Sequence, residues 1–242
     1  LGLRSLDGHA HSCWVGVIGG SEVDRGCGFE SKQLVVHSGG GVPVSLAQRV
    51  SAFNRDRKWR LFLRMLEPGP ETRVLDVGFT EREYSSVDNY LERHYPWPEM
   101  VTALGLHEAV EFRRRYPRVR PVRYDGIAFP FPDQAFDVVW SNAVLEHVGN
   151  FDRQVFFVME MVRVGRRVFF TTPNRWFPIE LHTRLPLVHW LPKPMCDRWL
   201  RRLGHGTATG DSLHLLGRND LRRVLRAAGV DCYQIITNRL AG

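Results

Sequence analysis

The six residues from Arg73 to Gly78, R-V-L-D-V-G, carry the strongest structural signal in this chain, because an apolar run ends there in an acid and a glycine. Such a run is typical of the first buried strand of a doubly wound α/β sheet. Ligands of these sheets bind beyond the carboxyl ends of the strands, where the order of winding reverses. Asp76 and Gly78 are therefore the first candidate ligand-binding residues.

Helical and strand-like segments alternate on both sides of this run. A long amphipathic helix is expected over residues 46–66, with an apolar face formed by Trp59, Phe62, Leu63 and Leu66. Apolar strands separated by helices of about ten residues predict a mostly parallel sheet covered on both faces. The other expected strands are 101–104, 119–124, 136–141, 167–172 and 231–237, and the other expected helices are 86–94, 107–116, 152–163 and 219–228.

Two of these helices show detailed signals. The apolar face expected for the helix at 152–163 consists of Val155, Val158, Met159 and Val162. The helix at 219–228 is expected to be capped by Asn219 and to stop at Gly229.

Length and composition predict one domain with appended segments. The 242 residues, 43% of them apolar, suffice for one sizeable core. Residues 1–42 are rich in glycine and serine and show no sustained period, so a flexible leader is expected there, followed by the domain at 43–242. Residues 173–217 are too many for an ordinary connection, and we expect them to form a substrate-binding cap.

Charge and cysteine content narrow the possible environments. The formal net charge of +7 comes mostly from scattered arginines, with one R-R-R cluster at residues 113–115. The four cysteines include no C-x-x-C pair, which argues against a disulfide framework or a zinc knot and favours the cytoplasm. No apolar run approaches the ~20 residues that cross a bilayer. No metal site is expected, and His9, His11 and Cys13 are interpreted as incidental.

Four segments together resemble class I S-adenosylmethionine-dependent methyltransferases, over roughly residues 50–240. They are V-L-D-V-G (74–78), V-T-A-L-G-L (101–106), R-Y-D-G-I-A-F-P-F-P-D-Q-A-F-D-V-V (123–139) and S-N-A-V-L-E-H-V (141–148). The L-E-H-V part is similar to the quinone-biosynthesis methyltransferases. The resemblance implies a Rossmann-like fold with S-adenosyl-L-methionine as cofactor. The family's last antiparallel strand is expected to be missing, because few residues follow the strand at 231–237.

The resemblance also implies where the cofactor binds. Asp125 would lie beside the adenine, with Gly126 and Ile127 as the adjacent wall. The other candidate cofactor-binding residues are Asp76, Gly78, Phe79, Thr80, Gly105, Leu106 and Asn142.

The chain departs from the family pattern at two places. The usual glycine-rich run is replaced by G-F-T-E-R-E-Y-S-S at 78–86, and the acid that usually holds the ribose hydroxyls is replaced by Gly105. The candidate substitutes for these groups are Glu81, Glu83, Asp88 and Asn89, with Leu106 and His107 as a cover for the adenine.

The chemistry of methyl transfer selects the remaining candidates. In-line displacement at a sulfonium needs an aligned acceptor, excluded water and at most one base. His147 is the expected base, oriented by Glu146, because an imidazole with a pKa near ~6.5 accepts a hydroxyl proton at neutral pH. A turn residue that only binds backbone is the other interpretation of His147. The candidate acceptor contacts are Asn174, Arg175, His182 and His189.

The most specific function that these patterns favour is methyl transfer to a small or lipid-like acceptor, at oxygen. Aromatic and arginine residues alternate in the predicted cap, which suits a lipid-like acceptor, a peripheral membrane contact or a core lid. A non-catalytic cofactor-binding relative is one alternative. An RNA methyltransferase is another, although S-N-A-V stands at 141–144 where an N/D-P-P-Y/F tetrad would be expected. A nicotinamide dehydrogenase is disfavoured, because no G-x-G-x-x-G follows the first strand.

Overall fold

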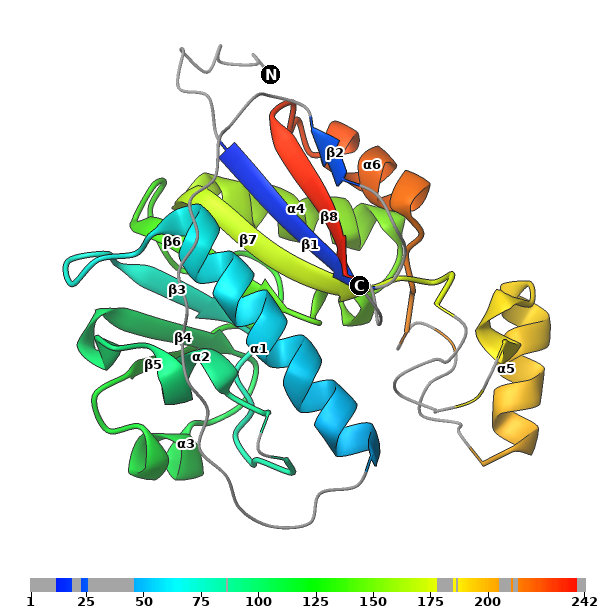
Figure 1. The fold of residues 1–242 in the computed structure, drawn as a ribbon, viewed down its shortest axis with the longest axis horizontal. Coiled ribbons are helices and arrows are strands. Elements are labelled where there is room, and N and C mark those ends of the chain that lie inside the picture. Colours follow the sequence, from blue (N-terminus) through cyan, green and yellow to red (C-terminus); the bar gives the residue numbers. More distant parts are fainter. Residues whose placement is uncertain are drawn as a thin grey trace.

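Helices lie on both faces of one sheet in the computed structural model, which describes residues 12–18, 23–25, 46–85, 87–177, 185, 187–204, 210 and 213–238 (Figure 1). The sheet has the strand order β2-β8-β1-β7-β6-β3-β4-β5. Strands pair in parallel throughout, except that β2 is antiparallel to β8. The winding reverses between β3 and β6. This is the doubly wound, mostly parallel α/β fold that the sequence predicts.

The elements have the following bounds. The strands are β1 (Ser12–Ile18), β2 (Val23–Arg25), β3 (Val74–Val77), β4 (Val101–Gly105), β5 (Arg120–Arg123), β6 (Phe136–Asn142), β7 (Gly165–Pro173) and β8 (Tyr233–Asn238). The α-helices are α1 (Leu46–Leu66), α2 (Tyr90–His94), α3 (Val110–Arg115), α4 (Phe151–Val164), α5 (Lys193–Arg202) and α6 (Arg218–Ala227). The short 3-10 turns with bounds in the described residues are η1 (Pro98–Met100), η2 (Leu145–His147) and η3 (Val188–Trp190).

The two faces of the sheet bury separate apolar clusters. Leu75 and Val77 of β3 pack in the cluster formed with α4 and α6, whereas Val74 packs in the cluster formed with α1, α2 and α3. Side chains alternate along a strand, so Asp76 shares the face of Val74 and points toward α1 and α2. Figure 1 shows α1 crossing this face, with α4 on the opposite side of the sheet. The fold thus directs the acid of the first quoted motif toward α1.

An aromatic cluster holds α1 on the sheet. The rings of Phe62 and Trp140 are 4.9 Å apart in a T-shaped arrangement, and Trp140 stacks on Phe169 at 5.1 Å. Trp59 stacks on Phe62 at 5.3 Å. Aromatic burial of this kind contributes strongly to a core. The helix that the sequence predicts over residues 46–66 is confirmed at both ends.

The prediction of a flexible leader over residues 1–42 is wrong for two segments, Ser12–Ile18 and Val23–Arg25, which form β1 and β2. β1 lies between β7 and β8 and is parallel to both, and β2 pairs antiparallel with the far side of β8. A strand between two others can be a continuous apolar run without alternation, so a search for periodicity misses it. The remainder of the predicted leader lies outside the described residues.

In the family pattern, the antiparallel strand follows the last parallel strand in the chain. The antiparallel strand described here has a different position. It is β2, which precedes α1 in the chain and pairs with β8. β8 therefore has a neighbour on each side, β1 and β2.

Three details of the helices differ from the prediction. The described buried apolar face of α4 consists of Phe157, Val158, Met161 and Val164, and Met159 is exposed. Apolar residues occur all round this helix, so two faces compete in the sequence. α6 begins after Gly217, whose amide donates to the Asp220 carboxylate at 3.0 Å, and not after Asn219. α2 covers only the second half of the helix predicted at 86–94. Among the described helices, none combines the length and the apolarity that crossing a membrane requires.

Candidate active site

The carboxyl ends of β3 and β6 meet at the point where the winding reverses. Gly78 has a φ of +109°, and a Cβ built on it would lie 2.4 Å from Cγ2 of Val144, which follows β6. The Ser141 hydroxyl donates to the Val77 carbonyl oxygen at 3.1 Å. Only glycine combines this backbone conformation with so close a contact. The prediction that these two strand ends face each other is confirmed.

Asp76 and Glu92 form a buried carboxyl pair at this edge. Both residues are buried, and neither carboxyl oxygen of Glu92 has a hydrogen-bond partner among the described residues. Burial raises the pKa of Asp76 to about 6. Burial and the adjacent Asp76 raise the pKa of Glu92 well above its ordinary value. Burial beside a second carboxyl therefore favours the protonated form of Glu92.

Helix α1 brings Lys58 to the same edge. The Lys58 ammonium donates to Asn142 Oδ1 at 3.0 Å and to Thr171 Oγ1 at 3.2 Å. The Thr171 hydroxyl also donates to Asn142 Oδ1, at 2.8 Å. Burial, with a smaller effect of Arg55, lowers the pKa of Lys58 to about 7, and Glu146 opposes this shift. Lys58 is thus poised between its charged and neutral forms near neutral pH.

Arg55, one turn before Lys58, adds a second cation from the same helix. Burial lowers its pKa, while the negative charges of Asp88, Asp76 and Glu146 act in the opposite direction. Neither cation is among the site residues predicted from the sequence. The available signal was their position in a helix whose buried face also carries Trp59 and Phe62.

The predicted catalytic residues lie in η2, directly after β6. Glu146 is fully buried, and its carboxylate accepts a hydrogen bond from the Thr172 hydroxyl at 3.0 Å. His147 Nε2 lies 4.0 Å from Glu146 Oε1, and 41% of the His147 side chain is exposed. The structure therefore brings the pair together, with the carboxylate inside and the imidazole at the surface.

The ends of β4 and β5 supply an apolar surface beside this edge. A Cβ on Gly126 would lie 3.2 Å from Leu106 Cδ2, so the two strand ends are in contact. Asp125 Oδ1 accepts the backbone N–H of Ile127 at 2.9 Å. The side chains of Leu106 and Ile127 are both about half exposed. These four predicted residues therefore form one continuous wall.

Phe79 occupies the space above Gly105. A Cβ on Gly105 would lie 2.6 Å from the Phe79 ring, which is buried against Phe112 at a centroid distance of 4.4 Å. A larger residue at position 105, an acid included, would collide with this ring. The backbone of Thr80 is engaged with the Asn89 side chain, which accepts from its N–H at 2.7 Å and donates to its carbonyl at 2.8 Å.

The loop that replaces the glycine-rich run is held by its own polar side chains. Glu81 accepts the backbone N–H groups of Glu111 and Phe112 at the start of α3, which lowers its pKa. Glu83 pairs with Arg93 and Arg115, and Asp88 accepts the backbone N–H groups of Tyr84 and Ser85. The residues considered as substitutes for cofactor contacts therefore have structural partners within the loop and its adjoining helices.

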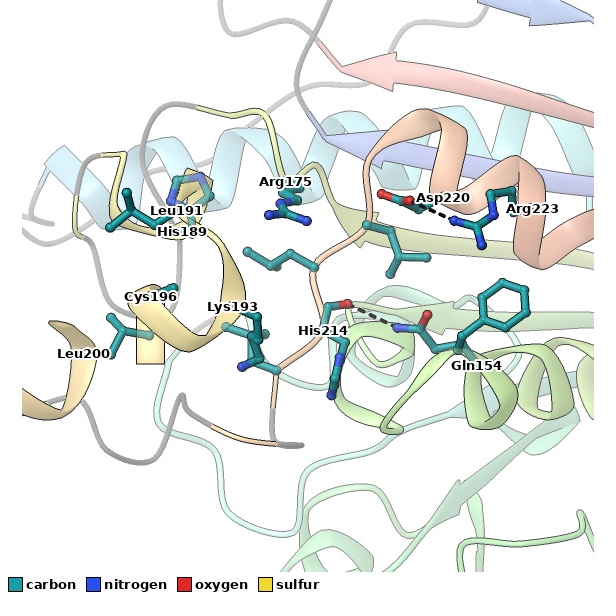
Figure 2. Close-up of a pocket in the computed structure, with 14 residues that line it drawn as sticks. Gln154, Arg175, His189, Leu191, Lys193, Cys196, Leu200, His214, Asp220 and Arg223 are labelled. Carbon is teal, nitrogen blue, oxygen red and sulfur yellow. Dashed lines mark hydrogen bonds and ion pairs between the residues drawn. The ribbon is translucent and has the colours of Figure 1, made fainter. Parts of the chain in front are cut away.

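A separate cavity of about 290 Å³ lies between the predicted cap and the sheet domain (Figure 2). Arg175 and His189 line it, as two of the predicted acceptor contacts. Asn174 is not among its lining residues, and Asn174 Oδ1 accepts the Trp176 N–H at 3.1 Å. His182 lies outside the described residues. Among the described part of the chain, no three His, Cys, Asp or Glu side chains are grouped as metal ligands.

Comparison with known proteins finds similarity in the central segment of the chain. A family model described as "Methyltransferase domain" matches residues 75–167. The glycine/sarcosine/dimethylglycine N-methyltransferase of Actinopolyspora halophila is 35% identical over 112 residues, which cover 43% of this chain and 19% of that protein. The chain thus spans about a fifth of the length of this relative.

Solved structures with similar folds have low sequence identity. YcgJ of Bacillus subtilis is 16% identical with a TM-score of 0.47, covering 72% of this chain and 68% of that chain. The geranyl diphosphate C-methyltransferase of Streptomyces coelicolor is 14% identical with a TM-score of 0.48, covering 74% of this chain and 61% of that chain. Residues 75–167 are therefore similar to a methyltransferase domain, and they lie in a sheet with the doubly wound strand order.

Proposed function

We propose that this chain transfers a methyl group from S-adenosylmethionine to an oxygen atom of a small or lipid-like acceptor. The observation that supports it most is the position of η2 between the strand edge and the cap cavity. Glu146 and His147 follow β6, and the Glu146 carbonyl accepts the N–H of His214, a residue that lines the cavity, at 2.7 Å. A molecule in the cavity and one at the strand edge would therefore adjoin the same turn.

The residues at the strand edge fit S-adenosylmethionine at its two ends. The Asp76 carboxylate suits the amino group of the methionine part, and the wall of Leu106, Gly126 and Ile127 suits the adenine. The ribose has no carboxylate partner at position 105, where the Phe79 ring lies instead. When bound, the cofactor supplies a methyl group on a sulfonium. The protein's task is then to orient the acceptor, exclude water and accept one proton.

Two groups of this chain are suited to accept that proton. His147 stands at the surface of η2, with the Glu146 carboxylate behind it. Lys58 has a pKa of about 7 and bonds to Asn142 and Thr171 at the ends of β6 and β7. We propose His147 as the base, because its side chain is accessible to an acceptor, and Lys58 as the alternative.

Asp76→Asn is expected to weaken binding of S-adenosylhomocysteine about tenfold or more, because a hydrogen bond to a charged group contributes ~1.5–3 kcal/mol. Glu92→Gln is the matched control. Its neutral amide has nearly the same shape as the carboxyl beside Asp76 and leaves Asp76 itself in place, so a change below about threefold is expected. Wild-type affinity should also fall as the pH drops below about 6, where Asp76 becomes protonated. Calorimetric titrations of the three proteins measure these effects. If Asp76→Asn binds S-adenosylhomocysteine as tightly as the wild type, Asp76 does not contact the cofactor.

The acceptor atom is tested directly by product analysis. The full chain is incubated with methyl-labelled S-adenosylmethionine and paired acceptors that differ only in carrying a hydroxyl or an amine on the same aromatic or medium-chain body. Label transferred to the hydroxyl compounds, with a mass gain of one methylene, supports the proposal. Label found only in the amines would overturn oxygen as the target.

A non-catalytic cofactor-binding relative is the second candidate, and the Phe79 ring above Gly105 is the observation that favours it. Such a protein would bind S-adenosylhomocysteine without transferring label to any acceptor. The double substitution Phe79→Ala with Gly105→Asp separates the cases. It restores a carboxylate where the resemblance expects one, and in a degenerate relative it should strengthen cofactor binding.

A further inference from the structure

We propose that the cavity beneath the cap binds the methyl acceptor, and that this acceptor is an anion with an apolar body. Its carboxylate or phosphate would lie against Arg175. The identification of the ligand as the acceptor rests on the proposed function, whereas the preference of the cavity for an amphipathic anion follows from its own lining. Cap residues of η3 and α5 form one side of it, and residues at the starts of α4 and α6 form the other.

The walls of the cavity are largely apolar. The apolar lining residues are Phe151, Leu191, Cys196, Leu200, Leu213, Leu215 and Leu216. A volume of about 290 Å³ suits a small organic molecule, and apolar walls of this kind bind hydrocarbon or aromatic bodies. The ligand therefore needs an apolar part of limited size.

The charges around the cavity leave one cation without a carboxylate partner among the described residues. Lys193 pairs with Asp197 at 2.8 Å, and Arg223 lies 3.9 Å from Asp220. Asp220 also accepts the Gly217 N–H at 3.0 Å. Arg175 has no such ion pair in the described part of the chain, and its guanidinium lies 5.7 Å from the centre of the Trp176 ring. Figure 2 shows Arg175 between the cap residues and the residues of the sheet domain.

A buried lone pair on His189 independently indicates a ligand. His189 is only 8% exposed, and its Nε2 lies 2.7 Å from the Phe177 carbonyl oxygen, so Nε2–H donates there. Nδ1 is then an acceptor, and it has no hydrogen-bond partner among the described residues. A buried polar atom left in this state is costly, and the hydroxyl of the bound acceptor, rather than its anionic group, would donate to it.

The start of one helix adds to the preference for an anion. Phe151 is the first residue of α4 and lines the cavity. The positive end of the α4 dipole therefore lies beside the cavity, which favours negative charge. The start of α6 does not contribute in this way, because the Asp220 carboxylate already caps it.

Binding of octanoate and its neutral isostere octanamide tests the proposal with the full chain and without cofactor. Calorimetry should show octanoate binding more tightly than octanamide. Arg175→Gln should weaken octanoate at least tenfold and leave octanamide unchanged. Arg226→Gln, which removes an exposed arginine of α6 outside the cavity, is the control and should change neither. Leu200→Trp should fill the cavity and abolish binding of both probes, while circular dichroism verifies that the protein remains folded.

Each outcome bears on the proposal. Equal affinities for octanoate and octanamide, or octanoate binding unaffected by Arg175→Gln, would overturn it, as would full binding by folded Leu200→Trp. The proposed function is measured separately, by titration with S-adenosylhomocysteine. If the protein prefers octanoate but does not bind cofactor, the cavity binds anions and the proposed methyl transfer is wrong. If the protein binds cofactor but does not prefer octanoate, the proposed anion site is wrong and the proposed methyl transfer is unaffected.

Discussion

Lys58→Met is expected to raise the free energy of unfolding by about 1–4 kcal/mol at pH 7, because a buried cation is replaced by an apolar side chain of similar length. The pKa of Lys58 is about 7 in the folded protein and 10.5 for an exposed lysine. Unfolding therefore takes up a proton between these two pH values, and wild-type stability increases as the pH rises through this interval. The advantage of the variant should shrink accordingly between pH 7 and about pH 10.

Urea unfolding of both proteins at pH 7 and about pH 9 measures this effect. Arg60→Met is the matched control, because the Arg60 side chain on the same helix is 57% exposed and its partner Asp56 is 40% exposed. The control should change stability by less than about 0.5 kcal/mol. A large loss of stability in Lys58→Met at both pH values would contradict the account. It would mean that Lys58 is a permanently charged partner of the buried Glu146.

His147→Ala is expected to reduce turnover about 100-fold, because general base catalysis typically contributes factors of this size. The affinity for S-adenosylhomocysteine should stay unchanged, since His147 is placed to contact the acceptor and not the cofactor. The loss should be smaller at high pH, where hydroxide and deprotonated acceptor replace the base. Single-turnover rates across pH, with calorimetry as the binding control, measure both quantities.

Turnover unaffected by His147→Ala would contradict this role and leave Lys58 as the base. The two cases differ in their pH profiles. A profile controlled by Lys58 should rise through a pKa of about 7 and disappear in Lys58→Met. If His147 is the base, Lys58→Met should leave both the rate and its dependence on pH unchanged.

Most of the sheet could be predicted, because its central strands are buried on both faces and read as continuous apolar runs. Val74–Val77 and Phe136–Asn142 are such strands, and their meeting at the winding reversal follows from topology alone. β1 could not be predicted in the same way. Its pairing with β7 and β8 is a long-range contact, and its local sequence does not indicate which strands it pairs with.

The candidate site was predicted in part for a related reason. Asp76 and Asn142 lie at the ends of β3 and β6, and Gly78 follows β3, so their proximity could be derived from the fold. The contribution of α1 could not, because a lysine in an amphipathic helix is ordinarily solvated. Only the docking of α1 through Phe62 and Trp140 turns Lys58 toward Asn142. In the same way, the packing of Phe79 over Gly105 depends on contacts with α3 that no local pattern records.

Binding of cofactor at the strand edge is measured by a calorimetric titration of the full chain with S-adenosylmethionine and S-adenosylhomocysteine, with NAD as the control. We expect micromolar binding of both sulfur ligands and no binding of NAD, because Asp76 and the wall of Leu106 and Ile127 are in place. If neither sulfur ligand binds, the strand edge is not a cofactor site, and Phe79 and the altered loop have closed it.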